Sequence, residues 1–316
     1  MTLAGKQIAV TGATGFLGRY IVEVLRERGA HVIGVVRNPE RVPELAARGV
    51  EIRRADLAAL ASLTAAFSGA DAVVSNAAVF SVRRLMAFRR RNWEEHQRTN
   101  VEGTRNVFEA LTAAGVRRVV HVSSVAVYAR RSGRPTTEDH PQLTEESLHH
   151  PWNTYHLSKA LSEQLAWRLS REHGLELTTV RPCGIYGAFD VNFMRAFKRL
   201  VAPRVSVFPV CLRLPLVYAG DVAEAIALAL ERPMSVGKAY NITGEDRDLS
   251  EFVEAWRDAG GRTARLLIPI PLPYRQSFDH SRARIDLGWH NRSYADGLRE
   301  TLALESRPGA MGSAGG

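Results

Sequence analysis

Short runs of aliphatic residues alternate with amphipathic segments through the first 180 residues of the chain. The aliphatic runs predict strands at residues 7–10, 31–36, 51–53, 72–75, 118–123 and 177–181. The amphipathic segments predict helices at residues 17–28, 57–67, 99–114 and 153–172, each followed closely by a glycine that can end it. Alternation of this kind is typical of an α/β fold with a doubly wound parallel sheet, covered by helices on both faces.

The first predicted strand leads directly into three glycines at three-residue spacing, Gly12, Gly15 and Gly18. Without Cβ atoms the backbone can turn sharply and approach a ligand closely, and the helix that follows points unpaired N–H groups at that ligand. The alternative is a plain glycine-rich turn. Because the glycines lie between a strand and an amphipathic helix, the sequence favours a site for the pyrophosphate of a dinucleotide.

The alternation of strand and helix patterns stops after Pro182. It resumes with a predicted strand at 216–218 and a helix at 221–231, for which Asp221 is the expected N-cap. We therefore expect a dinucleotide-binding domain at residues 1–182, completed by about 216–244. Residues 183–215 and 245–305 should form a smaller substrate lobe over the carboxyl edge of the sheet. The tail, 306–316, has few apolar groups and is expected to be disordered.

Composition limits the classes of protein that the chain can belong to. No apolar run approaches the ~20 residues of a membrane helix, and the first strand begins almost at the N-terminus. We therefore expect no transmembrane segment, no signal peptide and a cytoplasmic protein. Cys183 and Cys211 are too few for a disulfide framework or a thiolate metal site, so we expect two buried apolar fillers and no metal.

The formal net charge of +9 suits an anionic partner. The densest basic group is Arg83, Arg84, Arg89, Arg90 and Arg91, interleaved with apolar residues. It is either the solvated flank of a helix or a contact for an anionic substrate group or a lipid surface. No nucleic-acid-binding motif accompanies it, so we expect no nucleic-acid partner.

Tyr155 and Lys159 are four residues apart in a segment that reads as the start of a helix, which places both side chains on one face. By itself such a pair is common and usually exposed. Here Ser123 and Ser124 end one predicted strand and the glycine turn follows another, so all of these groups are expected to converge on one crevice.

With these motifs in place, the chain resembles an extended short-chain dehydrogenase/reductase of the NAD-dependent epimerase/dehydratase family, in its 3β-hydroxysteroid dehydrogenase-like branch. The segments that carry the resemblance, in family order, are residues 11–18, 56–57, 76–78, 99–104, 122–124 with 127–128, 155 and 159, 181–187, 220–223 and, more weakly, 287–289. The resemblance implies a Rossmann fold and a nicotinamide dinucleotide cofactor.

The resemblance also implies roles for individual residues. Tyr155 would be the general acid/base and Ser124 would polarise the substrate C–O group. Lys159 would hold the nicotinamide ribose and lower the pKa of the tyrosine. The implied cofactor contacts are Gly12, Thr14, Gly15, Phe16, Leu17, Gly18, Arg37, Asp56, Leu57, Asn76, Ala77, Ala78, Asn100, Ser123, Tyr155, Lys159, Pro182, Cys183 and Ile185. Asp56 and Asn100 have an alternative as helix caps.

Two departures from the family pattern narrow the chemistry. Val125 and Ala126 follow Ser124 where sugar-nucleotide dehydratases carry an Asp-Glu pair, which disfavours a dehydratase. Gly184 stands where many sugar-nucleotide enzymes place an asparagine, which favours an apolar alcohol or ketone as substrate. The side chains expected to line such a pocket, or else to be plain core, are Phe193, Phe197, Leu212, Leu214 and Leu216.

Arg37 follows the second predicted strand, where an NAD-specific enzyme usually presents an acidic residue to the ribose. An arginine there can bind the 2′-phosphate of NADP, with Arg41 as a second contact, although a solvated loop residue is the alternative. We therefore expect NADP, with NAD as the second choice.

The leading hypothesis is an NAD(P)-dependent oxidoreductase that interconverts a secondary alcohol and a ketone on a lipophilic or secondary-metabolite substrate. One alternative is a sugar or nucleotide-sugar epimerase with a retained cofactor. Another is a non-enzymatic dinucleotide-sensing protein, against which the intact Ser124, Tyr155 and Lys159 argue. The partner is a small-molecule substrate in the two enzymatic cases, and a homodimer is compatible with all three.

Overall fold

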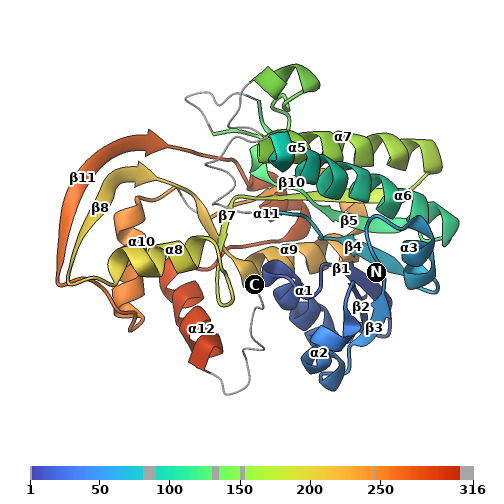
Figure 1. Cartoon of the computed structure of the whole chain (residues 1–316), viewed down its shortest axis with the longest axis horizontal. Coiled ribbons are helices and arrows are strands. Elements are labelled where there is room, and N and C mark those ends of the chain that lie inside the picture. The colour runs from blue at the N-terminus through green and yellow to red at the C-terminus, as the bar shows by residue number, and fades with distance from the viewer. Residues whose placement is uncertain (1, 81–89, 130–134, 150–153, 245, 307–316) are drawn as a thin grey trace.

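The computed structural model describes residues 2–80, 90–129, 135–149, 154–244 and 246–306. Its main sheet is parallel throughout, with the strand order β10-β6-β5-β4-β1-β2-β3 (Figure 1). The strands are β1 Gln7–Thr11, β2 His31–Val36, β3 Glu51–Arg54, β4 Ala72–Ser75, β5 Arg118–Val122, β6 Glu176–Pro182 and β10 Ala239–Ile242. The predicted doubly wound Rossmann-like fold is confirmed.

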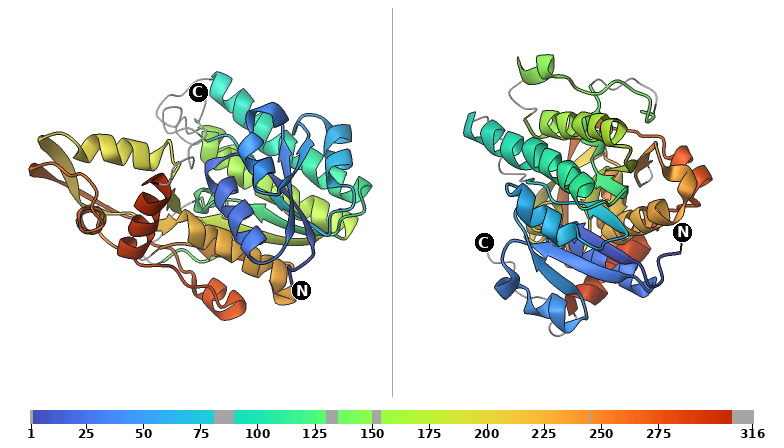
Figure 2. Two further views of the ribbon diagram at one scale, coloured as in Figure 1. Left: turned by 90° about the horizontal axis from the view of Figure 1, so that it is seen from below. Right: turned by 90° about the vertical axis from the view of Figure 1, so that its right-hand side faces the viewer.

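Helices cover both faces of this sheet (Figure 2). On one face α3, α6 and α7 pack side by side, and on the other α1 packs against α9. The helices of this domain are α1 Phe16–Glu27, α2 Pro43–Ala47, α3 Leu60–Phe67, α5 Arg90–His96, α6 Gly103–Ala113, α7 Thr154–His173, α9 Ala219–Glu231 and α11 Ser281–Leu287. None of the helices in the described part of the chain is long and apolar enough to span a bilayer.

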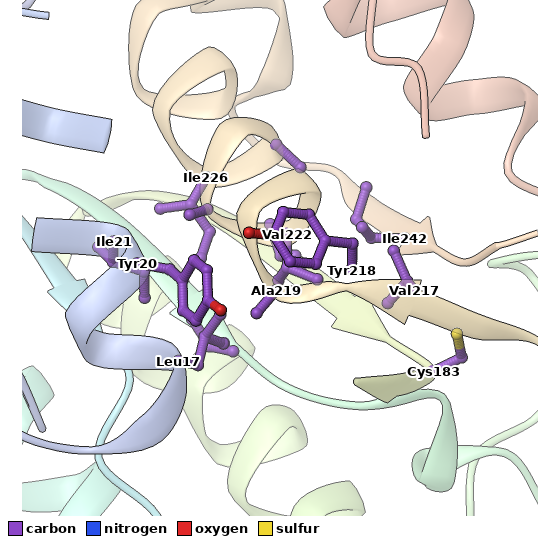
Figure 3. Close-up of a cluster of buried hydrophobic side chains, with 14 of the residues drawn as sticks. Leu17, Tyr20, Ile21, Cys183, Val217, Tyr218, Ala219, Val222, Ile226 and Ile242 are labelled. Carbon is purple, nitrogen blue, oxygen red and sulfur yellow. The ribbon is translucent and has the colours of Figure 1, made fainter. Parts of the chain in front are cut away.

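Successive residues of each strand enter different cores, as the period of a strand requires. Val119 of β5 belongs to the core with Phe67 and Phe108, whereas Val120 belongs to the core beneath α1 and α9. Figure 3 shows the second core, in which side chains of α1, β9 and α9 interdigitate. Tyr20 and Tyr218 meet there edge to face, with ring centroids 5.5 Å apart. This packing fixes the position of α1 and therefore of its N-terminus.

The second part of the molecule is smaller and lies beyond the carboxyl ends of the strands (Figure 1). It contains α8 Phe193–Val201, β8 Val205–Arg213, α10 Leu249–Asp258, β11 Leu266–Arg275 and α12 Tyr294–Ser306. Strands β8 and β11 pair with each other in parallel. A short parallel pair, β7 Gly184–Tyr186 with β9 Leu216–Tyr218, connects this lobe to the main domain.

Several local expectations were wrong. The strand at 216–218 pairs with β7 rather than with the main sheet, whose seventh strand is the unpredicted β10. Asp221 is not an N-cap, because α9 begins at Ala219 and the Asp221 carboxylate instead accepts a hydrogen bond from the backbone N–H of Arg292 at 2.7 Å. Cys211 is exposed, because it belongs to the outward face of β8.

Two helices also begin elsewhere than expected. The helix predicted from residue 57 begins at Leu60, because the Asp56 carboxylate accepts the N–H of Ala58 at 2.9 Å and closes a turn first. The helix predicted from residue 99 begins with a π-helical segment, Gln97–Glu102, that joins α5 to α6. Ser306, assigned to the tail, is the last residue of α12, and residues 307–316 lie outside the described part of the chain.

Candidate active site

The carboxyl ends of β1, β4, β5 and β6 meet at one edge of the sheet, and a cavity of about 430 Å³ opens there between the domain and the lobe. This volume lies within the range of ordinary small-molecule sites. The predicted site residues in its walls are Phe16, Leu17, Asn76, Ala78, Ser123, Ser124, Tyr155, Lys159, Pro182, Cys183 and Ile185. Residues that the sequence separates by more than 160 positions therefore share one cavity.

The glycine turn leads into the wall residues Phe16 and Leu17, although Gly12, Gly15 and Gly18 do not themselves line the cavity. Gly12 has a φ of +68°, and a Cβ added there would lie 3.0 Å from the Cα of Ala77. A Cβ on Gly18 would lie 2.0 Å from the Gly12 carbonyl oxygen, so only glycine fits at that position. Helix α1 begins at Phe16 with Gly15 as its N-cap and no side-chain cap. This cradle fits a pyrophosphate, because its N–H groups are not used by a capping side chain.

Thr11 holds the turn against the loop that follows β4. Its hydroxyl accepts the N–H groups of Asn76 at 3.0 Å and Ala77 at 3.1 Å. The Asn76 amide in turn donates to the Gly12 carbonyl at 3.4 Å. The sequence analysis did not single out Thr11, whose role depends on a contact with a distant strand.

Ser124 lies where β5 leaves the sheet and is the N-cap of a short 3₁₀ turn, Val125–Val127. Its hydroxyl accepts the N–H of Ala126 at 3.1 Å and donates to the carbonyl of Pro182 at 3.4 Å. These bonds direct the oxygen into the cavity, where it also hydrogen-bonds with the phenol of Tyr155. The hydroxyl and the phenol therefore face the same point.

Tyr155 lies in the first turn of α7 and packs edge to face against Phe80, with ring centroids 4.7 Å apart. Burial raises the pKa of its phenol to about 12, and the hydrogen bond with Ser124 opposes that shift. The Lys159 ammonium does not contribute to this shift in the structure, where it donates to a backbone carbonyl, so the expectation that its charge lowers the pKa of Tyr155 stays a prediction.

Lys159 is 3% exposed, and its ammonium donates to the carbonyl of Val122 at 2.8 Å. Burial lowers the pKa of this lysine to about 8, while the negative charge of Glu163 offsets part of the shift. The ammonium therefore remains mostly charged at neutral pH. It lies in the cavity wall, where it can donate to a ribose hydroxyl.

A buried ion pair lies one helical turn beyond Lys159. The carboxylate of Glu163 accepts from the guanidinium of Arg181 at 2.5 Å, and both side chains are almost fully buried. Burial acts to raise the pKa of Glu163, but the charge and hydrogen bonds of Arg181 hold it below its usual value. Arg181 also donates to the hydroxyl of Tyr128 at 2.9 Å. The motif residues Arg181 and Tyr128 therefore join α7 to β6 behind the cavity.

Three further predicted cofactor residues, Arg37, Asp56 and Leu57, follow the carboxyl ends of the outer strands β2 and β3. Arg37 follows β2 and is exposed, as are Arg41 and Asp56, whereas Leu57 packs against Gly103. Asn100 lies away from the cavity wall: its amide exchanges hydrogen bonds with both backbone groups of Val79 and donates to Ser158 at 3.0 Å. It is not a helix cap, since it lies inside the π-helical segment, and it braces the loop that carries Ala78 and Phe80.

The lobe closes the other side of the cavity with Phe193, Leu214 and Leu216, as expected. Phe197 and Leu212 do not line it; Phe197 is buried against Phe252 and Trp256. The wall residues that the sequence analysis missed are Phe80, His156, Asp190, Asn192 and Gln276. Of these only Asp190 carries a carboxylate, which accepts the N–H groups of Asn192 and Met194, each at 2.8 Å.

The basic group at residues 83–91 lies largely outside the described residues, and only the backbone of Arg90 and Arg91 is described, in α5. Within the described ranges, no three histidine, cysteine or acidic side chains come together as a metal site would require.

Comparison with known proteins places this site in context. Residues 8–243 match the sequence model of the NAD dependent epimerase/dehydratase family. Cinnamoyl-CoA reductase 1 of Oryza sativa subsp. japonica is 33% identical, over 96% of this chain and 91% of the rice protein. Sterol demethylase protein B of Methylococcus capsulatus is 30% identical, over 82% of this chain and 76% of that protein.

Solved structures share the whole architecture. The dTDP-glucose 4,6-dehydratase DesIV from Streptomyces venezuelae, solved with NAD and TYD bound, is 25% identical and superimposes with a TM-score of 0.75. The superposition covers 94% of this chain and 96% of that one. The fold around the cavity is therefore one in which a solved relative binds NAD.

Proposed function

This chain belongs to the NAD dependent epimerase/dehydratase family, and we propose that within it the chain is an NADP(H)-preferring oxidoreductase for lipophilic ketones and secondary alcohols. That the enzyme is an NAD(P)-dependent oxidoreductase or epimerase follows from the family and its reductase relatives. The substrate class and the cofactor preference are the proposal.

One observation carries the substrate class: around Ser124, Tyr155 and Lys159 the cavity is lined mainly by apolar side chains. Val125 and Ala126 occupy the wall beside the hydroxyl, and Phe193, Leu214 and Leu216 face it from the lobe. The carboxylate of Asp190 is already held by backbone N–H groups. The described wall thus lacks a second acid–base pair for eliminating water, and it suits a substrate that buries hydrocarbon.

Each polar residue of the site has its own role in the proposed reduction of a ketone. The Ser124 hydroxyl donates to the substrate oxygen, and the Tyr155 phenol, protonated at neutral pH, transfers its proton to that oxygen as the carbonyl becomes an alcohol. The Lys159 ammonium holds the nicotinamide ribose and offers positive charge to the phenolate that remains. A bound nicotinamide dinucleotide supplies the hydride for the carbonyl carbon. The glycine turn and the uncapped start of α1 hold its pyrophosphate.

The cofactor preference rests on Arg37, the first residue after β2. Its side chain is exposed at the carboxyl edge of the sheet, in line with the glycine turn after the neighbouring β1. A guanidinium in this position can pair with a 2′-phosphate, whereas it offers a 2′-hydroxyl no acceptor.

The test is reduction of a panel of steroid, polyketide and arylalkyl ketones, followed by NADPH absorbance. We expect stoichiometric oxidation of NADPH with an apolar ketone, and slower turnover with NADH. Conversion of substrate without net change in nicotinamide absorbance would overturn the proposal in favour of an epimerase.

An epimerase of sugar nucleotides is the second candidate, because a similar solved structure, 26% identical, contains UDP-glucose together with NAD. Its test is protection by millimolar UDP or GDP against thermal unfolding. Protection that disappears when Arg89, Arg90 and Arg91 are replaced by alanine would favour the epimerase. No protection by either nucleotide is expected for the oxidoreductase.

A further inference from the structure

The lobe carries an unusual concentration of exposed apolar side chains on the ribbon formed by β8 and β11. Among the described residues, fourteen large apolar side chains are exposed, and seven of them belong to this ribbon. The seven are Val205, Val207, Leu266, Ile268, Ile270, Leu272 and Tyr274, with exposures of 43–55%. Scattered exposed aliphatic residues are ordinary, but a contiguous group of this size indicates an interaction surface.

The strand register places most of these side chains on one face. Leu266 pairs with Val205 and Ile268 pairs with Val207, and residues paired in this way share a face. On the opposite face the lobe covers Phe208, which is buried, and Val210 and Leu267, which are partly buried against the core. Farther along β11 Pro269 and Pro271 of that face are exposed, so the lobe covers it along β8 and only at the start of β11.

The open edge of β11 has few backbone donors, because prolines occupy several of its outward positions. The N–H of Leu266 donates to the carbonyl of Arg204 at 3.1 Å, so alternation turns the nitrogens of Pro269 and Pro271 toward the open edge. Proline has no N–H, so another strand cannot extend the sheet there. The same absence lets this edge enter an apolar phase without leaving those donors unsatisfied.

Positive charge frames the apolar face. Residues 191–220 and 259–278, which contain both strands, include no Asp or Glu. They include eight basic residues, Arg195, Lys198, Arg199, Arg204, Arg213, Arg262, Arg265 and Arg275. Arg204 and Arg265 lie together at one end of the ribbon, where the Arg265 N–H donates to the Arg204 carbonyl. Arg213 and Arg275 are register partners at the other end, but Asp246 pairs with Arg275 at 2.5 Å, which offsets part of the positive charge there, and Glu305 pairs with Lys198.

The ribbon also leads to the cavity. Leu214, the residue after β8, and Gln276, the residue after β11, both line the cavity wall. Figures 1 and 2 show the two strands running from that point along the outer margin of the lobe. An apolar molecule in contact with this end of the ribbon therefore lies close to the cavity.

We propose that the exposed face of the β8–β11 ribbon, Val205, Val207, Leu266, Ile268, Ile270 and Leu272, docks on the surface of an anionic lipid bilayer. The aliphatic side chains enter the interface, and Arg204 and Arg265 at one end contact lipid phosphates. This interaction goes beyond the proposed function, because it requires neither cofactor nor turnover.

A second copy of the chain fits this face less well. Two ribbons stacked face to face in the same direction bring the end that carries Arg204 and Arg265 against the same end of the other copy. Like charges facing each other oppose association, whereas the same arginines match the negative potential of anionic lipid.

The experiment is flotation of the full chain with vesicles of phosphatidylcholine, with and without 30 mol% phosphatidylglycerol. We expect binding only with phosphatidylglycerol, weakened by high salt. Replacing two interface side chains, Ile268→Gln with Ile270→Gln, should lower partitioning by about tenfold or more. The matched control is Ile285→Gln, which changes an isoleucine 78% exposed on α11 and should leave partitioning unchanged.

A charge variant tests the second half of the proposal: Arg204→Gln with Arg265→Gln should lower partitioning on the order of tenfold. Because all of these side chains lie at the surface, the melting temperature and NADPH affinity should stay at wild-type values, which separates loss of docking from misfolding or loss of the active site. The proposal is overturned if the wild-type chain does not bind vesicles that contain phosphatidylglycerol. It is equally overturned if the isoleucine variant floats as well as wild type, or if that variant dissociates a dimer that does not bind vesicles.

Discussion

The two walls of the cavity are built in different ways. The wall that the parallel sheet contributes contains the polar groups of the reaction centre among apolar side chains, and backbone hydrogen bonds fix them, as the Ser124 hydroxyl is fixed by Ala126 and Pro182 and the Lys159 ammonium by Val122. The wall that the lobe contributes is mostly apolar, and in it Leu214 comes from the connection between β8 and β9 and Leu216 from the start of β9. Fixed polar groups suit a reaction centre, whereas apolar groups on a lobe suit selection of the substrate.

This division implies that the walls can be changed independently. Substitutions on the sheet side should alter the rate or the cofactor affinity, and substitutions on the lobe side should alter which substrate is bound. The following predictions test that separation, beginning with the largest effect.

Replacing Tyr155 by phenylalanine removes the phenolic proton but keeps the ring against Phe80. If Tyr155 is the proton donor, kcat should fall by roughly 10²–10⁴, as expected for loss of general acid catalysis. NADPH affinity, measured by fluorescence quenching, should change little. Steady-state rates near those of wild type would show that Tyr155 is not the proton donor, and the sheet side of the cavity would then not be the reaction centre.

Arg37→Ala tests the cofactor end of the polar wall. Loss of a charge-assisted hydrogen bond costs about 1.5–3 kcal/mol, so NADPH affinity should fall roughly 10- to 150-fold. NADH affinity should remain almost unchanged, because its ribose carries no phosphate. Arg41→Ala is the matched control, as Arg41 is also exposed but lies farther along the chain, and its effect should be smaller. Equal losses of affinity for NADPH and NADH in calorimetry would show that Arg37 does not bind the 2′-phosphate.

The charge of Lys159 predicts a pH dependence of cofactor binding. Burial holds its pKa at about 8, below the usual value of a lysine, so the ammonium is lost as pH rises through about 8. NADPH affinity should therefore fall by up to about tenfold per pH unit above that point. Tyr155, with a pKa of about 12, stays protonated over the same range.

Deprotonation of Lys159 affects the free energy of unfolding in the direction opposite to its effect on cofactor affinity. Because the folded pKa of Lys159 lies below its unfolded value, the unfolded chain binds more protons above pH 8, and this group makes the free energy of unfolding rise with pH in that range. A Lys159→Met variant should lose both dependences. Cofactor titrations between pH 7 and 9.5 that follow the same curve in wild type and variant would contradict the assignment.

An element or site residue can be predicted from the sequence when local contacts position it, and not when contacts between distant segments do. The strands at 31–36 and 72–75 agree with β2 and β4 because each is an aliphatic run bounded by turn residues. Tyr155 and Lys159 were predictable because helical spacing is a local property. Gln276 and Asp190 were not, since only the docking of the lobe brings them to the cavity. Strand β10 was missed because Asn241 interrupts its apolar run, and the backbone carbonyls that accept from its buried amide, those of Thr136 and Asp279, lie far away in the sequence.

The smallest predicted effect tests the apolar wall alone. Leu214 is partly buried in the lobe side of the cavity, and Leu214→Asn replaces hydrocarbon by an amide without reaching the sheet. Loss of part of one aliphatic contact costs about 1 kcal/mol, so KM for an apolar ketone should rise roughly fivefold while kcat and NADPH affinity stay near wild type. Leu272→Asn, a leucine 52% exposed on β11 and outside the cavity wall, is the control and should leave all three constants unchanged. A fall in kcat with unchanged KM would mean that the lobe positions the reacting groups, and the two walls would then act as one unit.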